Sequence, residues 1–135
     1  MKIVLDTNCL LPSIFKTSPY YWLWQAFRNF DFTLCYTTEI LNEYEEKMCE
    51  YYSEVVAKNI IDELLNAVNT QKLAPYYKWN LIYADPDDNK FVDCALNAGA
   101  DYIVTNDRHF NVLKTLGFPP VNVVDIETFK KMLLP

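Results

Sequence analysis

The sequence predicts an α/β protein built on a parallel sheet that helices cover on both faces. Short apolar runs alternate along the chain with longer segments of helical periodicity, and strands buried on both faces are typically such continuous apolar runs. With 135 residues, 51% of them hydrophobic, the chain is long enough for a substantial core. No repeat, linker or low-complexity tract divides it, so we expect residues 1–135 to form a single domain. The expected strands are residues 2–6, 32–36, 102–104 and 121–124.

Helices are expected between the strands in the first half of the chain. Apolar residues recur at helical spacing over 20–30, after Ser18 and Pro19, which suit an N-cap and a first helical turn. A long helical stretch covers about 38–70 and is interrupted near residues 52–53. We therefore expect two helices within that stretch.

The second half of the chain begins with an aromatic, irregular segment over 71–84. Asp85 and Pro86 then suit the start of a helix that ends at Gly99, because glycine readily adopts the left-handed conformation of a helix C-terminus. After the last strand, Asp125 is expected to cap a terminal amphipathic helix.

Composition argues against several classes of protein. No run approaches the roughly 18 uncharged apolar residues of a membrane span. The first acid follows only three apolar residues, which is too early for the apolar core of about 7–15 residues in a signal peptide. We therefore expect a cytoplasmic protein with no membrane partner. The four cysteines form no C-x-x-C pair and the chain has one histidine, so we expect reduced packing thiols and no zinc site.

The net charge of −6 would usually count against a nucleic-acid partner, because phosphate binding depends on basic patches. Binding of a metal ion by four of the acids would reduce that negative charge. Lys16, Lys90, Arg108 and Lys114 remain available to frame a phosphate path. The charge weakens a nucleic-acid hypothesis without excluding it.

Four carboxylates carry the functional interpretation: Asp6, Glu43, Asp88 and Asp107. Asp6 ends the first expected strand and Asp107 follows the third, and ligands of parallel α/β sheets bind beyond the carboxyl ends of the strands. If the fold gathers all four acids, their mutual repulsion requires a divalent cation, and oxygen-only ligands suit Mg²⁺ or Mn²⁺. A bound Mg²⁺ with a water to activate is the usual equipment for hydrolysing a phosphodiester.

Each acid also has a structural interpretation. Asp6 and Asp107 can form turns or cap helices after a strand. An isolated glutamate such as Glu43 on a glutamate-rich helix is usually solvated. Asp88 differs because helical geometry places it on the apolar face of its helix, where a carboxylate needs a partner. Asp93 lies about 140° around the helix from Asp88 and is a secondary candidate metal ligand.

Three neighbouring polar residues are weighed with the acids. Asn8 and Thr105 are short and lie next to acids in the sequence, so we expect them to orient metal ligands or a phosphate. His109 could serve as a general base. A lone histidine beside a strand end is more often structural or exposed, however, and a metal-bound water needs no histidine to become nucleophilic.

Taken in order along the chain, these motifs resemble the PIN-domain nucleases. The resemblance rests on residues 2–8, on residues 39–43, on residues 85–91 and on residues 98–107, and it extends to about residue 125. The sequence of residues 85–91 is most similar to that of the VapC-like toxins of bacterial toxin–antitoxin pairs. The family often has a further acid after the final aspartate of the pattern, where this chain has His109.

The resemblance implies a three-layer α/β/α fold with a central parallel sheet of four to five strands. It also implies that Asp6, Glu43, Asp88 and Asp107 hold Mg²⁺ or Mn²⁺ and serve the endonucleolytic cleavage of RNA. An antitoxin protein would be the partner if the chain is a toxin. The main hypothesis is therefore a metal-dependent endoribonuclease.

Two other functions stay open. One is a catalytically idle PIN-like module that only binds a protein or RNA partner, although such a module would lack an acid and none of the four is missing. The other is a phosphatase with Asp6 as nucleophile. Such enzymes generally have a second aspartate two residues later, where this chain has Asn8.

Aromatic residues are crowded over 20–30, and one helix face cannot bury all of them. Trp22 falls off the main apolar stripe. Two interpretations have equal weight: local packing against a loop, or a homodimer or partner surface, where aromatic residues are enriched.

Overall fold

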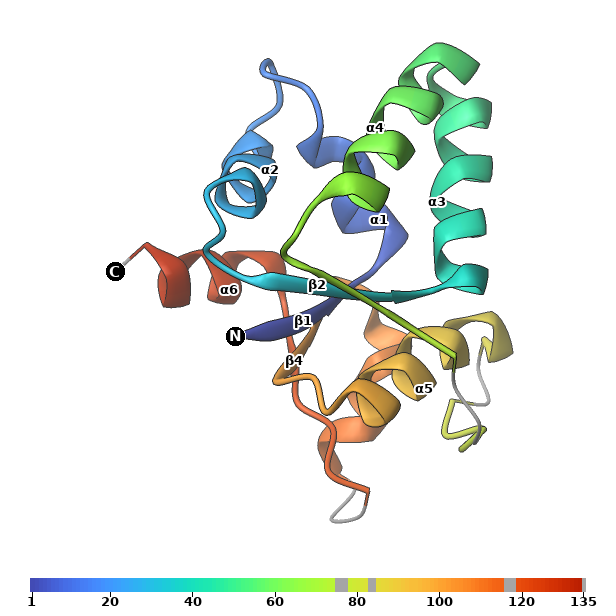
Figure 1. Ribbon diagram of the computed structural model, residues 1–135. Coiled ribbons are helices and arrows are strands. Elements are labelled where there is room, and N and C mark those ends of the chain that lie inside the picture. The colour runs from blue at the N-terminus through green and yellow to red at the C-terminus, as the bar shows by residue number, and fades with distance from the viewer. Residues whose placement is uncertain (75–77, 83–84, 116–118, 135) are drawn as a thin grey trace.

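The computed structural model describes residues 1–74, 78–82, 85–115 and 119–134. At its centre is a five-stranded sheet with the order β3-β2-β1-β4-β5, in which every neighbouring pair is parallel. Helices lie on both sides of this sheet (Figure 1). The predicted α/β class and three-layer arrangement are therefore confirmed. The strands are β1 (Lys2–Leu5), β2 (Thr33–Thr37), β3 (Thr70–Leu73), β4 (Tyr102–Val104) and β5 (Val123–Val124).

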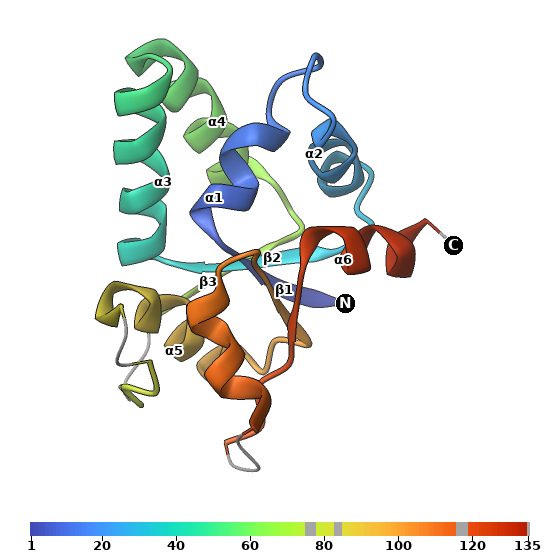
Figure 2. The same ribbon diagram turned by 180° about the vertical axis from the view of Figure 1, so that it is seen from behind.

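One group of helices covers one face of the sheet, and a second group covers the opposite face (Figures 1 and 2). The first group comprises α1 (Thr7–Leu10), α2 (Tyr21–Arg28), α3 (Thr38–Tyr51) and α4 (Glu54–Asn66). The second group comprises α5 (Asn89–Ala98) and the 3₁₀ helix η3 (Arg108–Thr115). The remaining elements are the 3₁₀ helices η1 (Leu11–Ser13) and η2 (Pro86–Asp88) and the terminal helix α6 (Ile126–Leu133).

Most predicted helix boundaries agree with these elements, but α2 begins at Tyr21 without a side-chain cap, so the expectation that Ser18 caps this helix is wrong. The chain turns at residues 52–53 between α3 and α4, and the Ser53 hydroxyl caps α4 by accepting a hydrogen bond from the Val56 amide. Gly99 ends α5 in the left-handed conformation, with φ of 64°. Asp125 caps α6 through the Thr128 amide. Local side-chain and glycine signals therefore set where these helices begin and end.

Strand β3 is absent from the sequence-based prediction, which treats the chain after residue 70 as irregular. The strand is short and polar, and it pairs only with β2 at the edge of the sheet. An edge strand is not buried on both faces, so it lacks the continuous apolar run that identifies a central strand. The rest of the predicted irregular segment lies partly outside the described residues.

The strand order places a topological switch at the middle of the sheet. From β1 the chain moves outward through β2 and β3, then returns to β4 on the other side of β1. Parallel α/β sheets bind ligands at such a point, beyond the carboxyl ends of the two strands. Asp6 directly follows β1 and Asp107 comes shortly after β4. The fold therefore brings two of the predicted site residues to the position where a ligand is expected.

Helix α2 buries aromatic side chains on more than one of its faces. Trp24 and Phe27 are buried in the core, and Trp22 is half-buried because α6 lies beside it. The Trp22 ring lies 6.4 Å from the ring of Phe129 and 5.7 Å from the Lys130 ammonium. The structure therefore supports local packing of Trp22, against α6 and not against a loop, and self-association through this helix stays a prediction. None of the helices in the described part of the chain is long and apolar enough to span a membrane.

Candidate functional site

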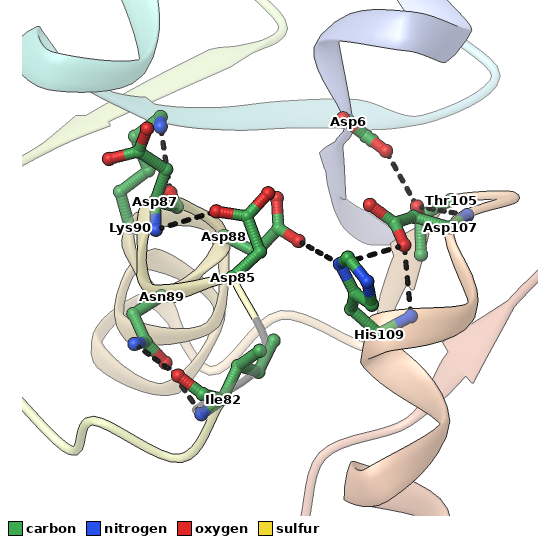
Figure 3. Close-up of polar contacts among 10 residues, drawn as sticks. All are labelled: Asp6, Ile82, Asp85, Asp87, Asp88, Asn89, Lys90, Thr105, Asp107 and His109. Carbon is green, nitrogen blue, oxygen red and sulfur yellow. Dashed lines mark hydrogen bonds and ion pairs between the residues drawn. The ribbon is translucent and has the colours of Figure 1, made fainter.

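Three carboxylates from three separate elements face one another beyond the central strands (Figure 3). Asp6 follows β1, Asp88 is the last residue of η2, and Asp107 lies between β4 and η3. The charges of Asp107 and Asp6 both act on Asp88, and Glu43 acts more weakly on Asp6. The three aspartates are thus close enough to repel one another, and Glu43 adds its charge on the side of Asp6.

Asp6 has both a structural and an electrostatic role. Its Oδ1 accepts a hydrogen bond from the Asn8 amide at 3.4 Å, which caps α1, and its Oδ2 accepts one from the Thr105 hydroxyl at 2.6 Å. Asp6 is only 5% exposed, and this burial raises the pKa of its carboxyl group, while the Thr105 hydrogen bond works in the opposite direction. The capping and functional interpretations of Asp6 are therefore compatible.

Thr105 links two of the acids. Besides donating to Asp6, its Oγ1 accepts a hydrogen bond from the Asp107 amide at 3.0 Å. The Asp107 carboxylate in turn accepts one from the His109 amide at 2.9 Å, as in a turn at the start of η3. Asn8, by contrast, is exposed and reaches Asp6 through its backbone. The contacts support an orienting role more clearly for Thr105 than for Asn8.

Asp88 is the least satisfied acid of the site. It is 9% exposed, and its Oδ2 has no hydrogen-bond partner among the residues that the structure describes. Burial, followed by the charges of Asp107, Asp85 and Asp6, raises the pKa of Asp88 to about 7. A buried carboxylate oxygen without a partner costs free energy unless a cation or a proton reaches it.

His109 and Asp85 also lie at the site, although neither was predicted as a metal ligand. The His109 Nδ1 atom lies 3.5 Å from Asp88 Oδ2 and 3.4 Å from Asp107 Oδ1 (Figure 3). Asp85 caps the segment by accepting from the Asp87 amide, as predicted, and it also lies beside Asp88 and His109. The positions of Asp85 and His109 in the sequence do not predict that they lie close together, because η2 and η3 are brought together only by the fold.

Glu43 differs from the other three acids because both of its oxygens already have partners. Its Oε1 lies 2.8 Å from the Lys90 ammonium, and its Oε2 accepts a hydrogen bond from the Thr7 hydroxyl. The Lys90 side chain is only 9% exposed and also donates to the Asp87 carbonyl. Lys90 was expected only as one cation of a phosphate path. The structure shows it as the counter-ion of Glu43.

Asp93, the secondary candidate, lies apart from this cluster. It is 5% exposed and accepts a hydrogen bond from the Trp79 amide at 2.9 Å. Burial raises its pKa, and the hydrogen bond from Trp79 lowers it. The chain near Ile82 covers this side of α5 and pairs with Asn89 through two hydrogen bonds. Asp93 therefore has a backbone partner of its own on a face that is buried by this segment.

The donor set suits a hard divalent cation. Asp6, Asp88 and Asp107 offer carboxylate oxygens, which Mg²⁺ and Mn²⁺ prefer. Burial, followed by the charges of neighbouring acids, raises the pKa of both Asp6 and Asp88, so a bound cation would stabilise their ionised forms, including the buried Oδ2 of Asp88. These observations fit a cation at the cluster, with Asp6, Asp88 and Asp107 available to hold it.

Comparisons with known proteins agree with this fold. A family model described as PIN domain matches residues 2–109. A chain in the crystal structure of VapBC2 from Rickettsia felis, bound to a DNA fragment from their promoter, superposes with a TM-score of 0.64 at 16% identity, covering 93% of this chain and 98% of that one. DNA-bound VapBC from Salmonella typhimurium gives 0.59 at 16% identity, with coverage of 93% and 98%. No curated protein matches the sequence.

Proposed function

Because this chain belongs to the PIN domain family, a family of nucleases, we propose that it is a Mg²⁺- or Mn²⁺-dependent endoribonuclease of the cytoplasm, formed by a single domain over residues 1–135. The observation that carries the proposal is the buried, unpartnered oxygen of Asp88 facing two further carboxylates. Such a group needs a cation, and a metal ion among carboxylates is suited to phosphodiester hydrolysis.

The proposed ligands are Asp6, Glu43, Asp88 and Asp107. When bound, a divalent ion supplies an activated water and stabilises charge on the phosphate oxygens. The protein contributes the positions of the oxygens: Thr105 orients Asp6, and the His109 amide orients Asp107. Glu43 contributes fully only if its Oε1 exchanges the Lys90 ammonium for the metal ion.

We propose that the RNA backbone binds in a polar hollow next to Asp107. The hollow has a volume of about 320 Å³, and Arg108 and Lys114 are among the residues that line it, together with Asn111. Cationic and amide side chains are typical partners of a nucleic-acid backbone. This local group of donors supports RNA binding despite the net charge of −6.

A toxin–antitoxin role is part of the proposal. The two similar solved structures described above are VapBC complexes bound to DNA, and a chain in each shares the fold of this protein. By analogy with those complexes, we propose an antitoxin protein as partner. We also propose a homodimer as the working assembly. The shared fold, at 16% identity, supports the toxin–antitoxin role. Proteins that share a fold can differ in function, so the role requires a functional test.

The test is an RNA cleavage assay with and without Mn²⁺, alongside DNA and a phosphatase substrate such as p-nitrophenyl phosphate. We expect Mn²⁺-dependent internal cleavage of RNA by the wild type and its loss in Asp6→Asn. The matched control is Asp62→Asn, which removes an exposed acid on α4 that pairs with Lys58. The control should cleave like the wild type.

Other outcomes would favour the alternatives. Hydrolysis of the phosphatase substrate that depends on Asp6, with RNA left intact, would favour an Asp-nucleophile phosphatase. RNA binding without cleavage under any metal condition would favour an idle PIN-like module. Cleavage that persists in Asp6→Asn would contradict the proposed site.

A further inference from the structure

We propose that Asp85, Asp88 and His109 form a binding site for a divalent transition-metal ion, with Zn²⁺ as the representative cation. One carboxylate oxygen from each aspartate and one ring nitrogen of His109 lie within 4.8 Å of one another. This site shares Asp88 with the proposed nuclease centre and deepens that proposal by assigning a nitrogen ligand. It adds Asp85 and His109 to the four acids discussed above.

The first argument is that His109 does not satisfy Asp88 by hydrogen bonding. Nδ1 lies 3.5 Å from Asp88 Oδ2 and 3.4 Å from Asp107 Oδ1, whereas good N–H···O bonds span about 2.7–3.2 Å. Asp88 Oδ2 is buried and has no hydrogen-bond partner within the described ranges. The oxygen therefore points at the imidazole nitrogen without being bonded to it.

The second argument is that these separations are those of two ligands on one ion. Zn²⁺ lies about 2.0–2.2 Å from its nitrogen and oxygen ligands, so two ligand atoms in a tetrahedral site are about 3.4 Å apart. The 3.5 Å distance from the His109 nitrogen to Asp88 Oδ2 matches this spacing. The Asp85 oxygen lies within 4.8 Å of both of these atoms, so it would move closer to them on binding the same ion.

The third argument concerns the kind of metal. Imidazole nitrogen favours Zn²⁺ and other transition-metal ions, whereas Mg²⁺ prefers oxygen ligands only. The cysteine spacing and the single histidine led us to expect no zinc site, and the proposal departs from that expectation because one nitrogen and two carboxylates can bind Zn²⁺ without a thiolate. His109 is the single histidine of the chain, so any coordination by imidazole must come from it.

The test measures metal binding directly, without RNA. The parent protein carries Cys49→Ser, because Cys49 is an exposed thiol that could bind Zn²⁺ by itself. Calorimetric titration with Zn²⁺ alone and with Mg²⁺ alone is compared for the parent, for His109→Ala and for Asp85→Asn. The matched control is Asp87→Asn, an exposed acid between Asp85 and Asp88.

We expect one Zn²⁺ per chain in the parent and an affinity at least about 100-fold lower in His109→Ala, since losing even an outer partner of a ligand typically costs about 10–100-fold. Asp85→Asn should also weaken Zn²⁺ binding, and Asp87→Asn should not. Mg²⁺ binding should be nearly the same in the parent and in His109→Ala. The ring resonances of the single histidine should shift in NMR spectra as Zn²⁺ is added.

Two results would overturn this site: Zn²⁺ affinity that is the same in His109→Ala and the parent, or histidine resonances that do not move at saturating Zn²⁺. Failure here is distinguishable from failure of the proposed nuclease. Cleavage with Mg²⁺ alone and no Zn²⁺ binding at His109 would remove only the transition-metal site. Zn²⁺ binding at His109 with no RNA cleavage would remove only the nuclease.

Discussion

The two sides of the acidic cluster differ in how their charges are balanced. On one side, Asp6, Asp88 and Asp107 repel one another, and Asp88 keeps a buried oxygen without a hydrogen-bond partner in the part of the chain that the structure describes. On the other side, Glu43 is neutralised by Lys90, with Thr7 bound to its second oxygen. A bound cation is therefore stabilised more by the three aspartates than by Glu43, whose charge Lys90 already balances.

This difference indicates that some acids of the cluster bind the metal ion while others hold the surrounding helices together. The Glu43–Lys90 pair joins α3 to α5, and the Thr7 hydroxyl adds α1. Pairs of this kind hold elements together because removing one partner leaves the other charge buried and unpaired. We therefore infer that the Glu43 side fixes the geometry of the site and that the three aspartates supply most of its affinity for metal.

The comparison predicts the largest effect for Asp88→Asn. This change should lower metal-dependent RNA cleavage by at least about 1,000-fold, since a bound metal ion contributes several kcal/mol to catalysis. Glu43→Gln should cost less, about 10–100-fold, because the Glu43 charge is already balanced by Lys90. Rates at saturating Mn²⁺ measure both effects. Equal losses in the two variants would mean that the two sides act alike.

Lys90→Met tests the second side of the cluster. Without the ammonium, Glu43 is left partly buried and unpaired, so we expect the metal-free protein to lose about 1–3 kcal/mol of stability, or about 5–10 °C in Tm. Mn²⁺ should raise the Tm of this variant more than that of the wild type, because it can occupy the place of the lost cation. Thermal unfolding in EDTA and in Mn²⁺ measures this. An identical response to Mn²⁺ in the two proteins would show that Glu43 does not reach the metal.

The sequence was a good guide where the signal is local. The central strands are continuous apolar runs, and the helix ends carry glycine, serine or aspartate signals, so these elements were predicted closely. The edge strand β3 was missed because it is polar and only partly buried. A central strand is buried on both faces and is therefore recognisable as an apolar run. The positions of Asp6 and Asp107 follow from strand ends alone.

The partners within the site could not be predicted in the same way. Lys90 and Glu43 are brought together by the packing of α5 against α3, and no periodicity in either helix indicates it. His109 was considered as a general base and expected more often to be structural or exposed; its side chain is 44% exposed, yet one ring nitrogen faces Asp88. Such contacts depend on the relative positions of elements that are far apart in the sequence.

The pH dependence of stability should reveal the unbalanced side. Burial and neighbouring acids raise the pKa of Asp88 from its ordinary value of 3.8 to about 7. Between these values the metal-free folded state binds more protons than the unfolded state, so the contribution of Asp88 to stability is present at low pH and is lost as the pH rises through about 7.

Asp88→Asn removes this titration, and the comparison is made in EDTA. At pH 5 the variant and the wild type should melt within about 2 °C of each other, whereas at pH 8 the variant should be more stable by about 5 °C or more, which corresponds to a little over 1 kcal/mol for a chain of this size. Millimolar Mn²⁺ should reverse the order at pH 8, because only the wild type offers the full carboxylate set. A constant difference in Tm from pH 5 to pH 8 would contradict the raised pKa.

The smallest effect on activity is expected for Asp93→Asn, which removes a buried acid outside both sides of the cluster. The Asp93 carboxylate accepts the Trp79 amide, and an asparagine oxygen can still accept that hydrogen bond. Cleavage should therefore stay within about threefold of the wild type, while Tm changes by no more than about 3–5 °C, equivalent to the net worth of about one hydrogen bond. Metal affinity should be unaltered, because Asp93 acts on a backbone amide and not on the carboxylates that face the switch point. A loss of cleavage comparable to that of Asp88→Asn, with the fold intact by circular dichroism, would place Asp93 in the metal site and show that α5 presents a different face to the substrate.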